Sequence, residues 1–254
     1  MSSVSPSVSS PRIHLWFTDG WCTSAVIELV AFDMAGTTID DHGLVYVALS
    51  DCVKETGATV TDADLQLWMG TDKITAIRAL MALGGVSTGP EEVNAAFERF
   101  RQLLTEAYRS TPPVALPGVE EALRTLASRG VKIALTTGFS DDVALPLLAA
   151  LGWTVGEGAS HLLDAVVTTS DVTAGRPAPY LIHHAMEKTG VTDVATVLAA
   201  GDTVVDLLAA RNAGVIGVGV LTGALPRDEL ERHPHHHILD SVVAVLGLPE
   251  VSGR

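Results

Sequence analysis

The first clear pattern along the chain is a short apolar run, IELVAF at residues 27–32, which ends at Asp33 and is followed by MAGTT. A short apolar run bounded by turn residues is typical of a strand buried on both faces of a parallel sheet. The pattern therefore predicts a buried parallel strand that leads into a tight loop, with Asp33 at its carboxyl end.

Residues 43–110 carry helical patterns and no strand signal. The clearest are LVYVALSDCVKETG, DKITAIRALMALGG and EEVNAAFERFRQLLTEAY, in which apolar residues recur at the spacing of one helix face. Pro112, Pro113, Pro117 and Gly118 then close the segment in the manner of a hinge. We therefore expect a helical lobe inserted after the first strand.

After this hinge, strand and helix patterns alternate. VKIALTTG, DAVVTTSDV, TVLAAGD and VIGVGVL have the short apolar character of strands, and helical stretches separate them. Such alternation builds a parallel sheet with right-handed crossovers. The sequence therefore predicts an α/β fold, a Rossmann-like doubly wound parallel sheet core with an inserted helical lobe. Residues 27–42 and 111–250 are assigned to the core and residues 43–110 to the lobe, and the later run HPHHHILD is expected to be a polar loop.

The start of the chain and its overall charge narrow the classes of partner. Residues 1–26 begin with the Ser/Pro-rich stretch MSSVSPSVSSPR, and we expect a disordered extension without a secretory signal. No apolar run reaches the roughly 20 residues that span a bilayer. Cys22 and Cys52 lack metal-ligand spacing, which favours a reduced, cytoplasmic location. A net charge of −14 argues against nucleic-acid binding over a broad face.

Polar residues lie at the ends of several predicted core elements. Asp33 closes the first strand, Thr136 in ALTTGFS closes the next one, Arg176 in GRPAPY precedes a helix, and Asp202 and Asp206 lie in GDTVVD. Singly, each suits an ordinary helix cap, turn or surface charge. Because ligands bind at the carboxyl ends of parallel strands, their joint placement indicates one site.

This set of residues suits the capture of a phosphoryl group. The anionic oxygens around phosphorus repel a carboxylate nucleophile unless cations neutralise them. Mg²⁺ held by Asp33 and Asp202, with Arg176 on the phosphoryl oxygens, would supply that charge. Thr136 and the backbone N–H groups of the loop after the first strand would donate hydrogen bonds to the same oxygens, while Asp206 would hold a metal-bound water or cap its helix. Attack by Asp33 would give an aspartyl-phosphate that water hydrolyses.

In chain order, these residues resemble the four sequence motifs of the haloacid dehalogenase superfamily, over residues 27–246. The resemblance implies a magnesium-dependent hydrolase in which the inserted lobe is a helical cap that closes over the site. It implies catalytic roles for Asp33, Thr136 and Arg176, substrate contacts by Thr37, Thr137, Gly138 and Met69, and metal binding by Asp33, the backbone carbonyl of Ala35, Asp202 and, through water, Asp206.

Within that superfamily, DMAGTT resembles the phosphonoacetaldehyde hydrolase, or phosphonatase, branch. Most phosphatases of the superfamily carry a second Asp two positions after the nucleophile, which protonates the leaving group, whereas this chain has Ala35, as that branch does. TTG at residues 136–138 and GRPAP at residues 175–179 are similar to the same branch. The resemblance places Lys73, in MGTDKITAIR, as a catalytic lysine that forms a Schiff base with the substrate aldehyde. Where the branch has a histidine three residues later, this chain has Ala76.

Three functions stay open on these residues. The first is a phosphatase for a small phosphorylated metabolite, such as a sugar or cyclitol phosphate, and Ala76 places it slightly ahead. The second is hydrolysis of a carbon–phosphorus bond through Lys73. The third is a non-catalytic relative that binds a phosphorylated ligand, against which the retained nucleophile and metal carboxylates argue. The expected partner is a small phosphorylated or phosphonate metabolite rather than nucleic acid or a membrane, and a homodimer is left open.

Overall fold

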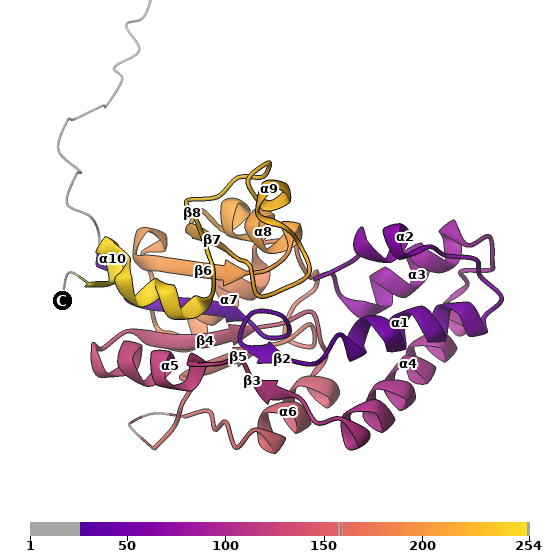
Figure 1. Cartoon of the computed structure of the whole chain (residues 1–254), viewed down its shortest axis with the longest axis horizontal. Helices are drawn as coiled ribbons and strands as arrows, with labels where there is room; N and C mark the ends of the chain where they lie inside the picture. Colours follow the sequence, from indigo (N-terminus) through magenta and orange to yellow (C-terminus); the bar gives the residue numbers. More distant parts are fainter. Residues whose placement is uncertain (1–25, 157, 159, 253–254) are drawn as a thin grey trace, which may run out of the picture.

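The structure is a computed structural model that describes residues 26–156, 158 and 160–252 (Figure 1). The expectation of a disordered extension at residues 1–26 falls on residues outside the described part of the chain, except for Val26. Cys22 also lies outside it. Within the described part of the chain, no helix is both long and apolar enough to cross a membrane.

Six parallel strands form the central sheet. They are β1 (Leu29–Asp33), β4 (Lys132–Thr136), β5 (Ala165–Val167), β6 (Val197–Gly201), β7 (Ile216–Val220) and β8 (His237–Leu239). Their order across the sheet is β5-β4-β1-β6-β7-β8, and each neighbouring pair is parallel. The carboxyl ends of β4, β1 and β6 therefore lie side by side at one edge of the sheet.

The strand β8 corrects one expectation. Its residues belong to HPHHHILD, which the sequence indicated to be a polar loop, but their backbone pairs in register with β7. An edge strand needs only one neighbour and can stay half-exposed. Here the polar residues come before a strand of only three residues, His237–Leu239, so the composition of the run did not predict its pairing.

Helices cover both faces of the sheet. α7 (Tyr180–Thr189) and α8 (Val204–Ala213) pack on one face, and α5 (Val119–Ser128), η2 (Val242–Gly247) and α10 (Pro249–Ser252) lie on the other. Side chains alternate between the faces of a strand, and in β1 Leu29 and Ala31 join the first of these layers while Val30 and Phe32 join the second. The remaining helical elements of the core are α6 (Asp141–Ala150), η1 (Val194–Thr196) and α9 (Arg227–Leu230). The predicted α/β fold with a doubly wound parallel sheet is confirmed.

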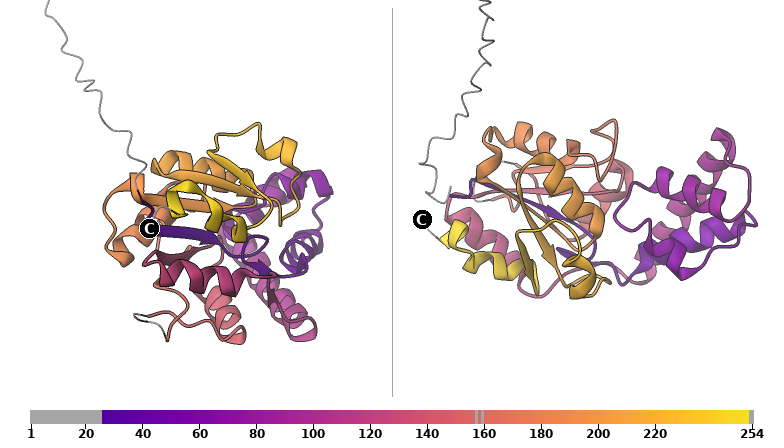
Figure 2. Two further views of the ribbon diagram at one scale, coloured as in Figure 1. Left: turned by 60° about the vertical axis from the view of Figure 1, so that its left-hand side comes forward. Right: turned by 90° about the horizontal axis from the view of Figure 1, so that it is seen from above.

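Four helices form a separate lobe beside the core, seen most clearly from above (Figure 2). They are α1 (Leu44–Glu55), α2 (Asp62–Gln66), α3 (Lys73–Leu83) and α4 (Pro90–Ser110), and we call them the helical lobe. A two-stranded antiparallel ribbon of β2 (Ile39–Asp40) and β3 (Val114–Ala115) joins the chain where it enters and leaves the lobe. α4 packs on α1 through the buried residues Val93, Ala96, Phe100 and Leu104, whose spacing is that of one helix face.

The helical lobe rests directly on the sheet edge that carries the candidate site. A Cβ atom added at Gly138, just after β4, would lie 2.9 Å from the carbonyl oxygen of Thr71 at the start of α3. Only a glycine permits this approach.

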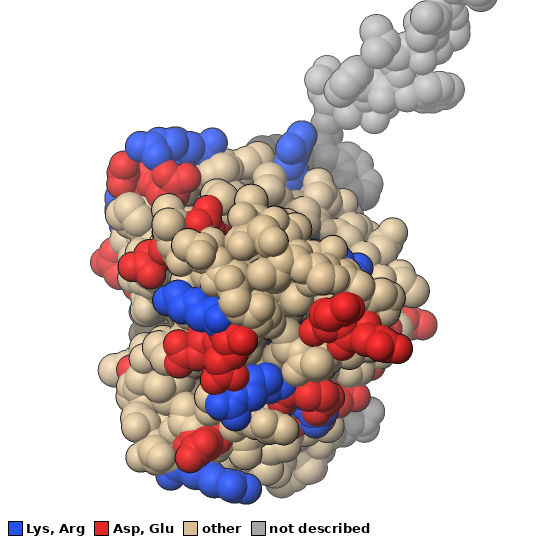
Figure 3. All heavy atoms as spheres, turned by 90° about the vertical axis from the view of Figure 1, so that its right-hand side faces the viewer, with Lys and Arg blue, Asp and Glu red and all other residues tan. Residues whose placement is uncertain are grey.

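On the face of the molecule drawn in Figure 3, acidic and basic side chains are interspersed rather than gathered into a basic patch.

Candidate active site

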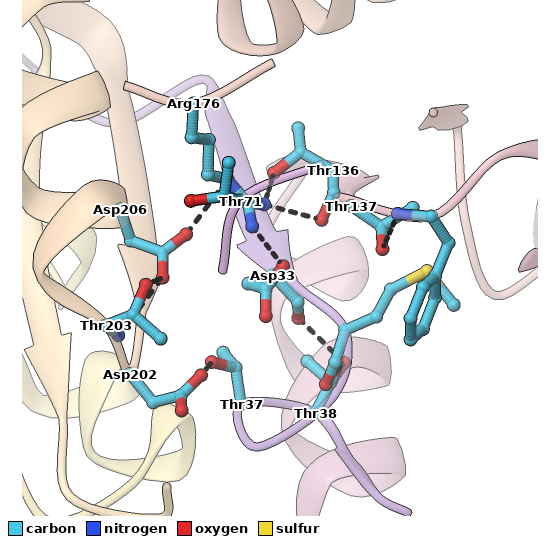
Figure 4. A network of polar contacts seen from close by, with 12 residues as sticks. Asp33, Thr37, Thr38, Thr71, Thr136, Thr137, Arg176, Asp202, Thr203 and Asp206 are labelled. Carbon is cyan, nitrogen blue, oxygen red and sulfur yellow. Dashed lines mark hydrogen bonds and ion pairs between the residues drawn. The ribbon is translucent and has the colours of Figure 1, made fainter. Parts of the chain in front are cut away.

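The ends of three neighbouring strands bring the predicted residues together. Asp33 ends β1 and Thr136 ends β4, and these two residues are partners in the sheet register. Asp202 directly follows β6, and Asp206 lies in the first turn of α8. Arg176, from the loop before α7, reaches into the same place (Figure 4).

The buried guanidinium of Arg176 joins these elements into one network. Its Nη1 lies 2.6 Å from Oδ1 of Asp33 and its Nε 2.9 Å from Oδ1 of Asp206. Its Nη2 donates to the carbonyl and the hydroxyl oxygens of Thr136, at 2.8 and 2.9 Å. Burial alone would lower the pKa of Arg176, but the charges of Asp206 and Asp33 outweigh it and raise the pKa above its ordinary value. Arg176, which the sequence assigned to phosphoryl oxygens, thus also holds the predicted nucleophile Asp33 and joins β4 to α8.

Three buried carboxylates crowd together at this point. One oxygen each of Asp33, Asp202 and Asp206 lies within 4.8 Å of the others. Burial raises the pKa of Asp33 to about 6, Arg176 acts against this rise, and the charge of Asp206 adds to it. Burial, followed by the charges of Asp33 and Asp206, raises the pKa of Asp202 well above its ordinary value. The cluster therefore carries more negative charge than Arg176 neutralises.

The donor set fits a hard divalent cation. Mg²⁺ binds oxygen ligands, and commonly one or two carboxylates together with water. Asp202 has one oxygen bound by the hydroxyl of Thr37, at 2.8 Å. Asp206 has Oδ1 on Arg176 and Oδ2 on the backbone N–H and hydroxyl of Thr203, so it caps α8 with both oxygens engaged. This arrangement suits a water-mediated role for Asp206 better than a direct one, and the assignment of the individual metal ligands stays a prediction.

Magnesium is expected to stabilise the protein more at pH 8 than at pH 5. Because the folded protein raises the pKa of Asp33 from 3.8 to about 6, the native state binds a proton that the unfolded chain has already lost. The metal-free protein should therefore lose stability as the pH rises through about 6. An ion at 100 times its Kd would restore about 2.7 kcal/mol, and protons compete with it at pH 5. Thermal unfolding at both pH values, with Mg²⁺ or with a chelator, measures this stabilisation. If Mg²⁺ stabilised an Asp202→Asn variant as much as the wild type, binding of the ion at this cluster would be contradicted.

The loop after β1 is held by its own hydrogen bonds. Thr38 donates from its hydroxyl to the carbonyl oxygens of Asp33 and Met34, at 2.9 and 3.2 Å. The backbone N–H groups of Gly36 and Thr37 bind the carbonyl oxygens of Ile39 and Met34, at 2.8 and 3.2 Å. These two N–H groups are therefore engaged within the loop, and the phosphoryl contacts expected from this loop stay a prediction. The substrate contact predicted for Thr37 also stays a prediction, and in this structure its hydroxyl donates to Asp202.

A glycine brings this loop against the carboxylate cluster. Gly36 has a φ of +84°, and a Cβ atom there would lie 2.6 Å from Oδ2 of Asp202. The Thr222 hydroxyl, from the loop after β7, donates to the Gly36 carbonyl oxygen at 2.6 Å. Ala35 forms an isolated bridge with Ile39, and metal binding by the Ala35 carbonyl stays a prediction.

Lys73 lies buried where the helical lobe meets the core. It is the first residue of α3, whose cap Asp72 accepts a hydrogen bond from the Thr75 backbone at 2.9 Å. Its Nζ donates to the carbonyl oxygen of Thr71 at 3.1 Å and lies 5.6 Å from the centre of the Phe139 ring. Burial lowers the pKa of Lys73 to about 8, with Asp33 acting against this change. Lys73 is therefore a buried amine at the boundary between the lobe and the core, and its pKa responds to the charge of Asp33.

A cavity of about 850 Å³ separates the helical lobe from the core at this point, and its lining includes Lys73, Arg176 and Gly138. Thr137 lies beside it, but its hydroxyl accepts a hydrogen bond from the backbone of Phe139 at 3.1 Å. Met69 is buried under the start of α3. The structure thus brings Lys73 and Gly138 to the cavity, whereas substrate binding by Thr137 and Met69 stays a prediction.

One residue at the site was missed by reasoning from the sequence. Tyr46, on α1 of the helical lobe, has its pKa raised by burial and then by the charges of Asp202, Asp33 and Asp41. No motif marks this position. The only signal available was its place on an amphipathic helix that directly follows the Asp33 loop.

Comparison with known proteins agrees with this geometry. A family model described as haloacid dehalogenase-like hydrolase matches residues 27–214. A phosphonoacetaldehyde hydrolase of Bacillus cereus (strain AH187) is 32% identical over 213 residues, which cover 78% of this chain and 77% of that protein. The solved structure of a hydrolase from Pseudomonas syringae matches with a TM-score of 0.75 and 26% identity, over 87% of this chain and 96% of that one. A phosphonoacetaldehyde hydrolase-like protein from Oleispira antarctica matches with a TM-score of 0.75 and 24% identity, over 91% and 94% of the two chains. The resemblance read from the motifs is confirmed: the chain belongs to the haloacid dehalogenase-like hydrolases.

Proposed function

We propose that this hydrolase removes the phosphoryl group of a small phosphonate whose carbonyl lies on the carbon next to the phosphorus-bearing one. Asp33 captures the phosphoryl group and Lys73 activates the leaving carbon. Residues 43–110 act as the cap over the site. The sequence alone placed a phosphate ester slightly ahead, and the surroundings of Lys73 reverse that order.

The proposal rests on the burial of the Lys73 amine, on its contacts and on its lowered pKa. A buried lysine without a carboxylate in direct contact is costly to keep charged, and the direct contacts of the Lys73 amine are the Thr71 carbonyl and the Phe139 ring. With a pKa of about 8, a tenth or so of the amine is neutral at pH 7. A neutral amine is the form that attacks a carbonyl. The 32% identity to a phosphonoacetaldehyde hydrolase supports the same chemistry.

The reaction divides into two covalent steps on different residues. The Lys73 amine condenses with the substrate carbonyl and releases water, giving an iminium. A carboxylate oxygen of Asp33 then attacks phosphorus, and the electrons of the carbon–phosphorus bond move into the iminium to give an enamine. Water hydrolyses the aspartyl-phosphate to phosphate, and a second water releases the protonated enamine as the carbonyl product. The net change is the substrate plus one water giving phosphate and the carbonyl compound.

The other residues of the network prepare Asp33 for this attack. Arg176, 2.6 Å from the carboxylate of Asp33, keeps the nucleophile ionised and oriented. The Thr136 hydroxyl, which accepts from Arg176, has its own hydrogen left to donate to a phosphoryl oxygen. Mg²⁺, held by Asp33 and Asp202, would neutralise the phosphoryl oxygens as Asp33 approaches.

A phosphate ester is the second candidate, and Ala76 favours it. This position is fully buried in α3 and offers no base for proton transfer to or from an iminium, the role open to a histidine. With an ester, Lys73 would instead act as the general acid that Ala35 cannot supply, because most of the amine is protonated at pH 7. The two candidates thus assign opposite protonation states to the same amine.

Phosphate release from a mixed panel separates the candidates. The panel holds phosphonoacetaldehyde, longer 2-oxoalkyl phosphonates and sugar and cyclitol phosphates, each with Mg²⁺ and with a chelator. We expect Mg²⁺-dependent release from at least one carbonyl-bearing phosphonate, at a kcat/KM at least about tenfold above that of any ester. Faster turnover of an ester that has no carbonyl would establish the second candidate instead.

A further inference from the structure

An ion pair joins the helical lobe to the core away from the two connecting strands. Arg101 lies in the middle of α4, and its Nε pairs with Oδ2 of Asp142 in the first turn of α6. Arg101 also binds Oε1 of Glu98 on its own helix, at 2.9 Å, which orients the guanidinium. Among the residues that the structure describes, no other ion pair connects residues 44–110 with the rest of the chain.

The ion pair contacts the lobe at a distance from its covalent connections to the core. The covalent connections run through β2 and β3, beyond the end of α4 at Ser110. Arg101 lies nine residues before that end, about 14 Å along the helix. In Figure 1, α4 and α6 lie side by side although β3, α5 and β4 separate them in the chain. A contact placed at this distance resists rotation of the lobe about its connections more than one placed at the hinge would.

The same pair lies at the mouth of the cleft that holds Lys73. Arg101 and Asp142 both line the cavity of about 850 Å³ between lobe and core, and both also line a groove of about 960 Å³ between α4 and α6. Among the described residues they are the only ones that the two linings share. The pair therefore lies where the cleft and the groove adjoin.

Direct packing between helices connects α4 to Lys73. α3 packs on α4, and Phe97, one turn before Arg101, lines the cleft together with Lys73. Since Lys73 is the first residue of α3, a displacement of α4 from α6 carries the lysine away from the strand ends and opens it to water.

We propose that Arg101 and Asp142 are positioning residues that form a polar latch, which holds the lobe closed and so keeps the Lys73 amine buried beside Asp33. The inference rests on the proposed function for its catalytic consequence but not for its structural one. Both side chains are about one third exposed, 35% for Arg101 and 37% for Asp142. Such a pair shifts an equilibrium modestly, by up to about fivefold, and salt weakens it.

The first test measures the accessibility of Lys73 without any substrate. Arg101→Ala and Asp142→Ala are acetylated with a limiting reagent, and mass spectrometry compares Lys73 with Lys54, an exposed lysine of the same lobe. We expect Lys73 to react about threefold to fivefold faster in either variant, no faster in the double variant than in the singles, and at the wild-type rate when the charges are exchanged in Arg101→Asp/Asp142→Arg. In 0.5 M NaCl the wild type should approach the variants. The matched control is Arg99→Ala, which breaks a pair with Glu55 inside the lobe and should change nothing.

The second test uses whichever substrate the panel identifies. The latch predicts a KM raised by the same factor as the Lys73 reactivity with kcat little changed, because saturating substrate closes the lobe. Unchanged Lys73 reactivity in both variants, or equal effects in Arg99→Ala, would overturn the latch. A lowered kcat/KM with unchanged Lys73 reactivity would mean that Arg101 contacts the substrate instead. Failure of the phosphonate chemistry would appear in the panel alone and leave the acetylation result standing.

Discussion

Replacing Asp33 by Asn is expected to reduce phosphate release by at least about a thousandfold. An amide is a poor nucleophile towards phosphorus and lacks the charge with which a carboxylate binds Mg²⁺. The change keeps the size of a side chain that is buried and 2.6 Å from Nη1 of Arg176, and Arg176 retains Asp206 as a partner. The variant should therefore fold, and circular dichroism and thermal unfolding would verify this before phosphate release is measured.

Asp228→Asn is the control for this prediction. Asp228 lies on α9 and its side chain is 72% exposed in an ion pair with Arg232, so the same chemical change there should leave turnover within about twofold, as for most surface substitutions. If folded Asp33→Asn released phosphate at a rate near that of the wild type, the assignment of the nucleophile would be wrong. A second check is a phosphorylated peptide containing Asp33, which should be seen in acid-quenched wild type and be missing from the variant.

The core of this fold was predictable because its strands are buried on both faces. Such strands appear in the sequence as continuous apolar runs, and the runs that end at Asp33 and Thr136 correspond to β1 and β4 in full register. β8 was not predictable in the same way. This strand has only three residues, His237–Leu239, which are too few to show an alternating pattern, and its extended conformation depends on pairing with β7.

The members of the site were predictable, but not their partners. The sequence placed Asp33, Arg176 and Asp206 at element ends that face one ligand position, because strand-end placement follows from topology. It could not show that one buried guanidinium binds both carboxylates, since that depends on how α8 packs on β6, the neighbour of β1. Similarly, the hydrogen bond between Thr37 and Asp202 joins residues 165 positions apart, and no local pattern encodes it.

The lowered pKa of Lys73 belongs to the same class of unpredictable features. A lysine at the start of a helix is usually solvated, and the sequence around position 73 is that of an ordinary amphipathic helix. Its burial arises because Gly138 lets the start of α3 lie directly on the core, where the carbonyl of Thr71 takes up the Lys73 amine. The sequence could place the lysine near the site only through its resemblance to a family segment.

Trapping the Lys73 amine on a carbonyl substrate is the prediction that separates the two proposed chemistries. Borohydride added during turnover of a 2-oxoalkyl phosphonate should reduce the imine and leave a stable adduct that mass spectrometry locates on Lys73. Because the neutral amine reacts, adduct formation should rise with pH through about 8, the pKa that burial gives Lys73, rather than near 10.5. Lys73→Arg should lose at least about a hundredfold in kcat on this substrate, because a guanidinium stays protonated and forms no such imine.

Lys54→Arg, on the exposed face of α1, is the control and should keep both turnover and trapping. The ester candidate predicts the opposite pattern. In that case no adduct forms, activity falls as the pH rises through about 8 because the protonated amine is the acid, and Lys73→Arg keeps part of the activity, since its positive charge still attracts the anionic substrate. The direction of the pH dependence is therefore a second measurement of the role of Lys73: a rate that rises through pH 8 is expected for the amine as a nucleophile, and a rate that falls is expected for the amine as an acid.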